Sequence, residues 1–311
     1  MPACVMVAAG EWRALGRPTA ARTQEHLDGH DCHRRQCKYL IQIESMFSMT
    51  VRSVSPGLAP LLELLELEQP RVLTVAGLAE YAHQAGVDWP TNVIAQRLRE
   101  RGWLLPLSTR GVWEFAPAAR AGAYGSGDPL IELRAVLARD PDTLLAVAAE
   151  SAAYFHGLSS RRPETECISV PAGIRPPKSL GAYRVVRWIA AIPPVRREGL
   201  PVWSIATILA FMASRPAGYH DWPNVGEWLV QAASAVEVDE LMAELVRQSA
   251  GSWARAAYLL ARGEADSSAR ALMRHAPKGV GPHYLGDRRV PGRHHAVYDV
   301  VDSTGFEVSS A

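Results

Sequence analysis

The chain has 311 residues, which is enough for two domains that each bury an apolar core. Hydrophobic residues make up 48% of it and charged residues 21%, as in ordinary globular proteins, and the formal net charge is +1. This balance excludes a protein that is drawn to nucleic acid or membrane by its overall charge, so any affinity for DNA must come from local patches.

Membrane and secretory classes are also disfavoured. No apolar run approaches the roughly 20 residues of a membrane-spanning helix, and the first residues lack the basic start of a secretory signal. The 4 cysteines do not form a disulfide framework. We therefore expect a cytoplasmic protein without a membrane partner.

Residues 1–52 differ from the rest of the sequence, because no helical or strand period persists across them. Three cysteines and three histidines lie in this stretch, but their spacing matches no common paired zinc site, so we expect no metal. We interpret the stretch as a disordered or misannotated N-terminal extension, with Met46 or Met49 as the native start.

Residues 53–117 have the pattern of a winged helix-turn-helix. Thr74 is a good N-cap for a helix that stops at Gly86, and Asp88 to Thr91 offer start signals for the next helix. Gly111 supplies a positive φ for a tight turn between two short strands. The expected elements are helices at about 57–68, 74–85 and 91–101 and strands at 103–107 and 112–115.

The helix at 91–101 has one face suited to DNA. Ile94 and Leu98 would hold it to the core, while the opposite face carries Asn92, Gln96 and Arg99. Asn and Gln pair bidentately with adenine and Arg with guanine in the major groove. Arg110, at the hairpin turn, is suited to a phosphate or to the minor groove. The alternative is a helix–hairpin unit that packs only against protein.

Residues 118–128 predict a linker, and residues 129–311 a C-terminal domain in which helices and strands alternate in groups, so the expected fold class is α+β. The expected helices are 129–138, 142–156, 203–213, 225–232, 236–248, 252–261 and 266–274, and the expected strands are 166–170, 183–188 and 296–301.

No motif predicts an enzyme or a cofactor. The chain has no phosphate-binding glycine loop, no zinc-binding helix and no nucleophile elbow, so we expect no catalytic residue. His156, at a helix end, is interpreted as structural. Two basic groups could add phosphate contacts: Arg161, Arg162, Arg175 and Lys178, and, as the better candidate, Arg288, Arg289 and Arg293.

Three blocks together resemble the AbiEi-type antitoxins of abortive-infection (AbiE-like, type IV) toxin–antitoxin systems, in an actinobacterial, mycobacterial-like branch. The first is Leu98-Arg99-Glu100-Arg101-Gly102-Trp103-Leu104 with Arg110-Gly111-Val112-Trp113. The second is Ser151-Ala152-Ala153-Tyr154-Phe155-His156-Gly157-Leu158 with Ile168-Ser169-Val170-Pro171. The third is Trp253-Ala254-Arg255-Ala256-Ala257-Tyr258-Leu259-Leu260 with Tyr298-Asp299-Val300-Val301-Asp302.

The resemblance implies a winged-helix domain that binds inverted repeats in its own promoter as a repressor, and a C-terminal domain that counteracts a companion nucleotidyltransferase toxin. The residues expected to contact DNA are Thr91, Asn92, Gln96, Arg97, Arg99 and Arg110. Two alternatives stay open. One is a transcriptional regulator whose C-terminal domain senses a ligand or a partner, and the other is a DNA-modifying enzyme.

Overall fold

The computed structural model of the protein describes residues 55–120 and 125–308. The expectations for residues 1–52, including the cysteine and histidine cluster and the native start, lie outside the described residues. The described residues all belong to one compact unit.

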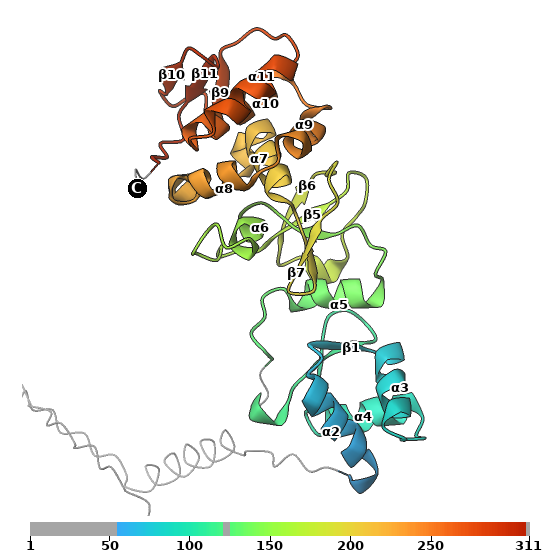
Figure 1. Ribbon diagram of the computed structural model, residues 1–311. Coiled ribbons are helices and arrows are strands. Elements are labelled where there is room, and N and C mark those ends of the chain that lie inside the picture. Colours follow the sequence, from blue (N-terminus) through green and yellow to red (C-terminus); the bar gives the residue numbers. More distant parts are fainter. Residues whose placement is uncertain (1–54, 121–124, 309–311) are drawn as a thin grey trace, which may run out of the picture. The chain divides into compact units, whose positions relative to one another are not determined.

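The first part of this unit combines helices with a small sheet (Figure 1). The elements are a 3₁₀ turn at Pro56–Leu58, α2 (Ala59–Glu68), β1 (Val72–Thr74), α3 (Val75–Gln84), α4 (Thr91–Glu100), β2 (Leu104–Pro106) and β3 (Val112–Phe115). The three strands pair antiparallel in the order β1-β3-β2. The helices and the hairpin strands lie where the sequence predicted them, whereas β1 was not predicted.

Local chemistry sets the ends of these elements. The Thr74 side chain accepts a hydrogen bond from the N–H of Gly77 at 3.0 Å, so the predicted N-cap of α3 is confirmed. Gly86 and Gly102, which follow α3 and α4, both have positive φ, and so does Gly111 in the β2–β3 turn. Buried aliphatic side chains from every helix then form one apolar cluster, which includes Leu61, Leu65, Leu78, Ile94, Leu98 and Phe115.

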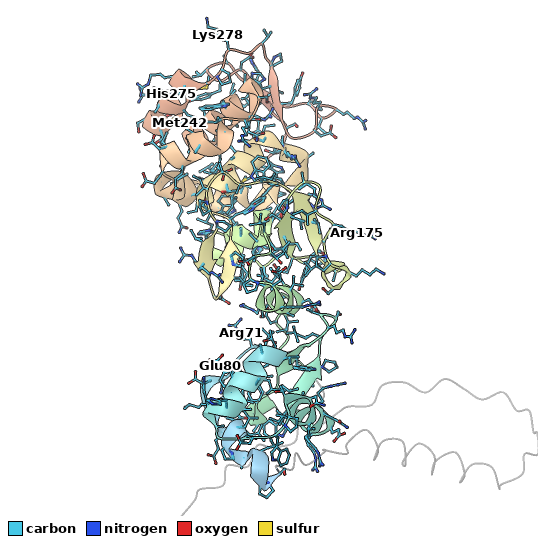
Figure 2. The ribbon with its side chains drawn as sticks, turned by 90° about the vertical axis from the view of Figure 1, so that its right-hand side faces the viewer. Arg71, Glu80, Arg175, Met242, His275 and Lys278 are labelled. Atoms are coloured by element: carbon cyan, nitrogen blue, oxygen red, sulfur yellow. The ribbon has the colours of Figure 1, made fainter. Side chains whose placement is uncertain are left out.

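Helix α5 (Ile131–Arg139) follows and contacts β1 and β3. Asp128, just before α5, accepts hydrogen bonds from the N–H of Leu130 at 2.9 Å and from Arg134 at 2.7 Å. It also forms an ion pair with Arg71 at 3.3 Å, and Figure 2 shows Arg71 at this junction. The α5 helix is therefore tied to the residues that lead into β1.

A five-stranded mixed sheet comes next, in the order β6-β5-β4-β8-β7. Its strands are β4 (Ala146–Val147), β5 (Cys167–Val170), β6 (Arg184–Arg187), β7 (Val195–Arg197) and β8 (Leu200–Val202). The β4–β8 and β5–β6 pairs are parallel, and the β4–β5 and β7–β8 pairs are antiparallel. Helix α6 (Ala149–Phe155) packs against β5 and α7.

The last part is helical and ends in a small sheet. The helices are α7 (Ile205–Ser214), α8 (Leu229–Ala235), α9 (Val238–Leu245), α10 (Ala250–Arg262) and α11 (Asp266–His275). The sheet has the order β10-β11-β9, formed by Arg293–His295, Val300–Asp302 and His283–Leu285. Helix α10 packs against α7, α8 and α11, and its residues 251–260 are all buried. Groups of helices thus alternate with sheets, so the predicted α+β class is confirmed.

One expected helix, 142–156, is wrong in its first half. Residues 146–147 form β4, and the helix covers only Ala149–Phe155. The run from Leu145 to Ala149 is buried throughout because β4 is the middle strand of the five-stranded sheet. A strand buried on both faces has no alternating pattern, and periodicity alone does not separate it from a buried helix. The strand expected at 296–301 is also shorter, because Asp299 adopts a positive φ and pairing begins at Val300.

The apolar core predicts a contrast between two leucines of α2. Leu65 is fully buried and Leu67 is 79% exposed, although they lie in the same helix. Leu65→Ala should lower the free energy of unfolding by about 2–5 kcal/mol, because it removes buried methyl groups and leaves a cavity. Leu67→Ala should change it by less than about 0.5 kcal/mol. Urea unfolding followed by circular dichroism checks both, and equal losses would contradict this packing.

Candidate nucleic-acid interface

Helix α4 presents its polar face to solvent. Asn92, Gln96, Arg97 and Arg99 are exposed, whereas Ile94, Ala95 and Leu98 on the other side are buried in the apolar cluster. The aliphatic residues hold the helix by one face, so the opposite side chains are available to a ligand as far as the described residues are concerned. This arrangement is the one that the spacing of the sequence predicted.

Four of the six predicted DNA-contacting residues lie together. Thr91, Asn92, Gln96 and Arg99 line one groove of about 810 Å³. Its other wall is formed by β2, by one residue of β3 and by the first residue of α3: Leu104, Leu105, Pro106, Trp113 and Val75. Side chains that can read base edges are therefore combined with apolar groups that could contact a thymine methyl or a sugar. We call this space the α4 groove.

Glu100 changes the electrostatics of the α4 groove. It lines the groove one turn after Gln96, and its carboxylate accepts a hydrogen bond from the Gln96 side-chain amide at 2.8 Å. A carboxylate here repels phosphate and occupies a donor that would otherwise face a base. Gln96 must exchange this hydrogen bond for one to a base before it can read sequence.

Arg97 lies apart from the other three polar residues of α4. It lines a small space with Arg101, Leu58 and Leu62, on the side of α4 that faces α2. The predicted set is thus divided by the helix into a group in the α4 groove and a single arginine outside it.

Arg110 lies in the β2–β3 turn, and this turn is attached to the rest of the chain. The N–H of Ser108 donates to the Glu132 carboxylate of α5 at 2.7 Å, and the Thr109 hydroxyl donates to the other Glu132 oxygen at 3.4 Å. The Thr109 hydroxyl also lies 3.3 Å from the Ser179 hydroxyl, and Thr109 is buried. The Arg110 side chain itself remains exposed.

The turn shares a groove of about 420 Å³ with two cations that the DNA-contacting set did not include. These are Arg139, at the end of α5, and Lys178, at the start of a 3₁₀ turn (Lys178–Leu180). Lys178 was noted in the sequence as part of a basic group, but its proximity to Arg110 depends on tertiary contacts. We call this space the wing groove.

The predicted tail group of basic residues lies elsewhere. Arg293 lines a separate space of about 310 Å³ with Tyr258 and Arg262 of α10. The Arg288 guanidinium stacks on the ring of Tyr284, 5.4 Å from its centroid. Neither residue lines the α4 groove or the wing groove. Arg288, Arg289 and Arg293 as additional phosphate contacts therefore stay a prediction without a geometric link to α4.

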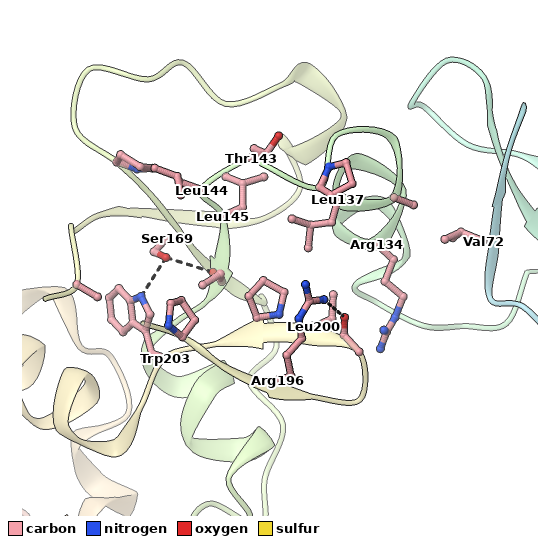
Figure 3. Close-up of a pocket in the computed structure, with 18 of the residues that line it drawn as sticks. Val72, Arg134, Leu137, Thr143, Leu144, Leu145, Ser169, Arg196, Leu200 and Trp203 are labelled. Atoms are coloured by element: carbon pink, nitrogen blue, oxygen red, sulfur yellow. Dashed lines mark hydrogen bonds between the residues drawn. The ribbon is translucent and has the colours of Figure 1, made fainter. Parts of the chain in front are cut away.

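A further cavity, of about 800 Å³, lies beside the five-stranded sheet (Figure 3). Its wall is largely apolar and includes Leu137, Leu145, Leu200 and Trp203. The Trp203 indole N–H donates to Ser169 at 3.0 Å, and the Arg196 guanidinium donates to the Gly199 carbonyl at 3.2 Å. These three polar side chains are thus bonded within the protein.

His156 and Cys167 are of residue types that can act in catalysis, but their contacts and burial fit a structural role. A ring nitrogen of His156 lies 2.7 Å from the Trp203 carbonyl and donates to it, and burial lowers the pKa of His156 despite this hydrogen bond. Burial also raises the pKa of the Cys167 thiol to about 12, so a reactive thiolate does not form at neutral pH. The structural interpretation of His156 agrees with these contacts.

The described residues contain neither a metal-binding cluster nor a membrane-spanning helix. No group of three or more histidine, cysteine or acidic residues within 55–120 and 125–308 could hold a metal ion. Over the same ranges, the longest apolar helices fall short of what is needed to cross a bilayer.

Comparison with known proteins decides the family of the central segment. Residues 145–262 match the family model of the AbiEi antitoxin C-terminal domain. This segment is an AbiEi antitoxin domain. It begins at β4 and ends at α10, so it contains the five-stranded sheet and the helices packed on it. The resemblance to AbiEi-type antitoxins that the sequence predicted is confirmed, and a family of antitoxins fits the expectation of a protein that is not an enzyme.

A solved structure is similar over most of the chain. The crystal structure of the RV2827C protein from Mycobacterium tuberculosis superposes with a TM-score of 0.66 and is 25% identical in sequence. The alignment covers 83% of this chain and 94% of the mycobacterial chain. No curated protein matches the chain. The similarity of fold between the two proteins therefore extends beyond the segment that matches the AbiEi model.

The surroundings of His156 predict a pH effect on stability. Its folded pKa is lowered below the ordinary value of about 6.5, so its contribution to stability is complete above that value and is lost as the pH falls below it. Wild-type protein should lose more stability between pH 7.5 and pH 5 than His156→Asn, as measured by urea unfolding at each pH. The exposed His275 supplies a control. His275→Asn should keep the wild-type dependence, and identical pH profiles for all three proteins would contradict the assignment.

Proposed function

We propose that the protein is a DNA-binding antitoxin that represses its own operon and counteracts a companion nucleotidyltransferase toxin. In this proposal residues 53–117 are a winged helix-turn-helix domain, 118–128 a linker and 129–311 the antitoxin domain. The match of residues 145–262 to the AbiEi antitoxin domain carries the antitoxin role. The exposed α4 groove supports the DNA-binding role.

The winged helix-turn-helix assignment rests on the order of elements. The chain runs helix, strand, helix, helix and hairpin, and the isolated strand β1 pairs with β3 of the hairpin. Helix α4 is the second helix of the α3–α4 pair, the position of a recognition helix. A separate apolar cluster within residues 58–115 is consistent with a domain of its own.

Docking of α4 in the major groove follows from its exposed face. Asn92 and Gln96 would pair with adenines and Arg99 with a guanine, each by two hydrogen bonds. The apolar wall from β2 would contact thymine methyls or sugars. Arg97, outside this groove, would contact a phosphate, which fits its position toward α2. Inverted repeats in the promoter are the expected target, since a repressor of this kind binds as more than one copy.

The toxin partner follows from the family. An antitoxin implies a toxin, and we propose a nucleotidyltransferase encoded beside this gene, with both proteins in the cytoplasm. Membership of a mycobacterial-like branch is supported by the similarity to the Mycobacterium tuberculosis structure. Neutralisation with or without direct contact between the two proteins is compatible with this proposal.

One observation favours the alternative of a ligand-responsive regulator. The cavity of about 800 Å³ beside the five-stranded sheet has the size and apolar lining of a small-molecule site. This alternative predicts DNA binding without toxin neutralisation, so it differs from the first proposal in the outcome of co-expression.

Substitutions on α4 test the DNA-binding proposal. Gln96→Ala and Arg99→Ala should each weaken binding to a duplex from the region upstream of the gene by about 1–3 kcal/mol and relax the base preference, because each removes a bidentate base contact. Arg97→Ala is the matched control on the same helix and should leave the base preference unchanged. Fluorescence anisotropy titrations against the upstream duplex and a shuffled duplex check this. Unchanged affinity for both groove variants would exclude the docking.

Co-expression tests the antitoxin proposal. Growth inhibition by the product of the neighbouring gene should be relieved by the full chain and by the full chain carrying Gln96→Ala and Arg99→Ala, because the antitoxin domain does not include α4. Residues 118–311 alone should also relieve it. Failure of the full chain to restore growth would contradict the antitoxin role and favour the ligand-responsive regulator.

A further inference from the structure

The wing groove collects cations from three separate parts of the chain. Arg110 comes from the β2–β3 turn, Arg139 from the end of α5 and Lys178 from the 3₁₀ turn before β6, and all three side chains are exposed. Asp140 is the acidic residue that lines the same groove. The groove therefore has an excess of positive charge, although the chain as a whole carries a net charge of only +1.

This cluster is held in place by polar contacts. Glu132 accepts hydrogen bonds from the Ser108 N–H and the Thr109 hydroxyl, and Thr109 also contacts Ser179, the neighbour of Lys178. The turn that carries Arg110 is thereby attached to the elements that carry Arg139 and Lys178. Cations fixed in this way lose less conformational freedom when they bind an anion than cations on a free loop.

The wing groove continues the surface proposed to face DNA. Residues 104–106 of β2 line the α4 groove, and residues 108–110 of the following turn line the wing groove. At the rise of an extended chain, residues 106 and 108 are separated by about 7 Å. The two grooves are therefore neighbours, and this step is smaller than the roughly 12 Å width of the major groove, so one duplex is wide enough to reach both.

We propose that the wing groove binds the phosphate backbone of the duplex that α4 reads, so that Arg139 and Lys178, which lie outside the winged helix-turn-helix, contribute to DNA affinity. This inference rests on the proposed DNA-binding function. Arginine and lysine are the side chains that contact backbone phosphates most strongly, and such contacts add affinity without sequence preference.

The salt dependence of binding tests this proposal. The full chain carrying Arg139→Gln and Lys178→Gln is titrated against the upstream duplex and the shuffled duplex over a range of salt concentrations. Loss of two phosphate contacts should reduce the slope of log K against log salt by about two units, since each contact contributes about 0.9. Both duplexes should be weakened by the same factor, and the base preference should be retained. Arg110→Gln should reduce the slope by about one unit.

A control variant separates local contact from net charge. Arg247→Gln with Arg274→Gln removes the same charge from exposed positions outside the wing groove, and it should leave the slope at the wild-type value. Thermal melting checks that every variant is folded. The wing-groove proposal is overturned if its double variant keeps the wild-type slope or if the control lowers the slope equally. In that case, loss of base preference in the α4 variants would show that α4 still reads DNA, so that only the wing-groove proposal fails. If the wild-type protein binds neither duplex, the proposed function fails with it.

Discussion

Two carboxylates at the start of α5, Asp128 just before the helix and Glu132 in its first turn, connect the helices around α4 to the rest of the described chain. Asp128 accepts hydrogen bonds from Leu130 and Arg134 and pairs with Arg71, while Glu132 holds the Ser108–Thr109 turn. Burial alone would raise the pKa of Asp128, but the Leu130 N–H and the Arg134 guanidinium lower it on balance, so the carboxylate stays ionised. A carboxylate that is mostly withdrawn from water and bonded through both oxygens is costly to separate from its partners, which makes this junction a specific attachment.

The contacts of Asp128 and Glu132 affect how one chain could combine the two proposed activities, DNA binding and toxin neutralisation. The α4 groove is lined only by residues before position 114, and the matched AbiEi domain begins at residue 145. Helix α5 lies between these parts in the sequence and contacts β1 and β3 on one side, while Leu133 and Val136 join the core of the larger part. Any movement of α5 would therefore displace the β2–β3 turn, because Glu132 bonds it directly.

The polar face of α4 carries a carboxylate, Glu100, that offsets the positive charge of Arg99. Glu100 holds the Gln96 amide and adds negative charge to a groove that otherwise has a single arginine. In the proposed DNA-binding function, a groove of this kind would give selective but weak recognition, since much of the affinity of a protein for DNA comes from phosphate contacts. Basic residues outside α4 would then be needed, and the wing groove contains three of them.

Much of this could be derived from residue spacing. The i, i+4, i+7 pattern of Asn92, Gln96 and Arg99 against Ile94 and Leu98 placed the polar and apolar faces of α4 correctly, and Thr74 marked the start of α3, because helix faces and caps depend on neighbouring residues. Of the short blocks that carried the AbiEi resemblance, those at 151–158, 168–171 and 253–260 lie within the matched segment, and those at 98–104, 110–113 and 298–302 lie outside it.

Other features depended on contacts between distant residues. The strand β4 was expected to be helical, because a run buried on both faces carries no period, and only its pairing with β5 and β8 decides its conformation. The grouping of Arg110 with Arg139 and Lys178, and the separation of Arg97 from the α4 groove, depend on how helices pack. Sequence by itself determined which residues are exposed on one helix, since that is local geometry. Tertiary structure decided which exposed residues share a surface, because long-range packing brings them together.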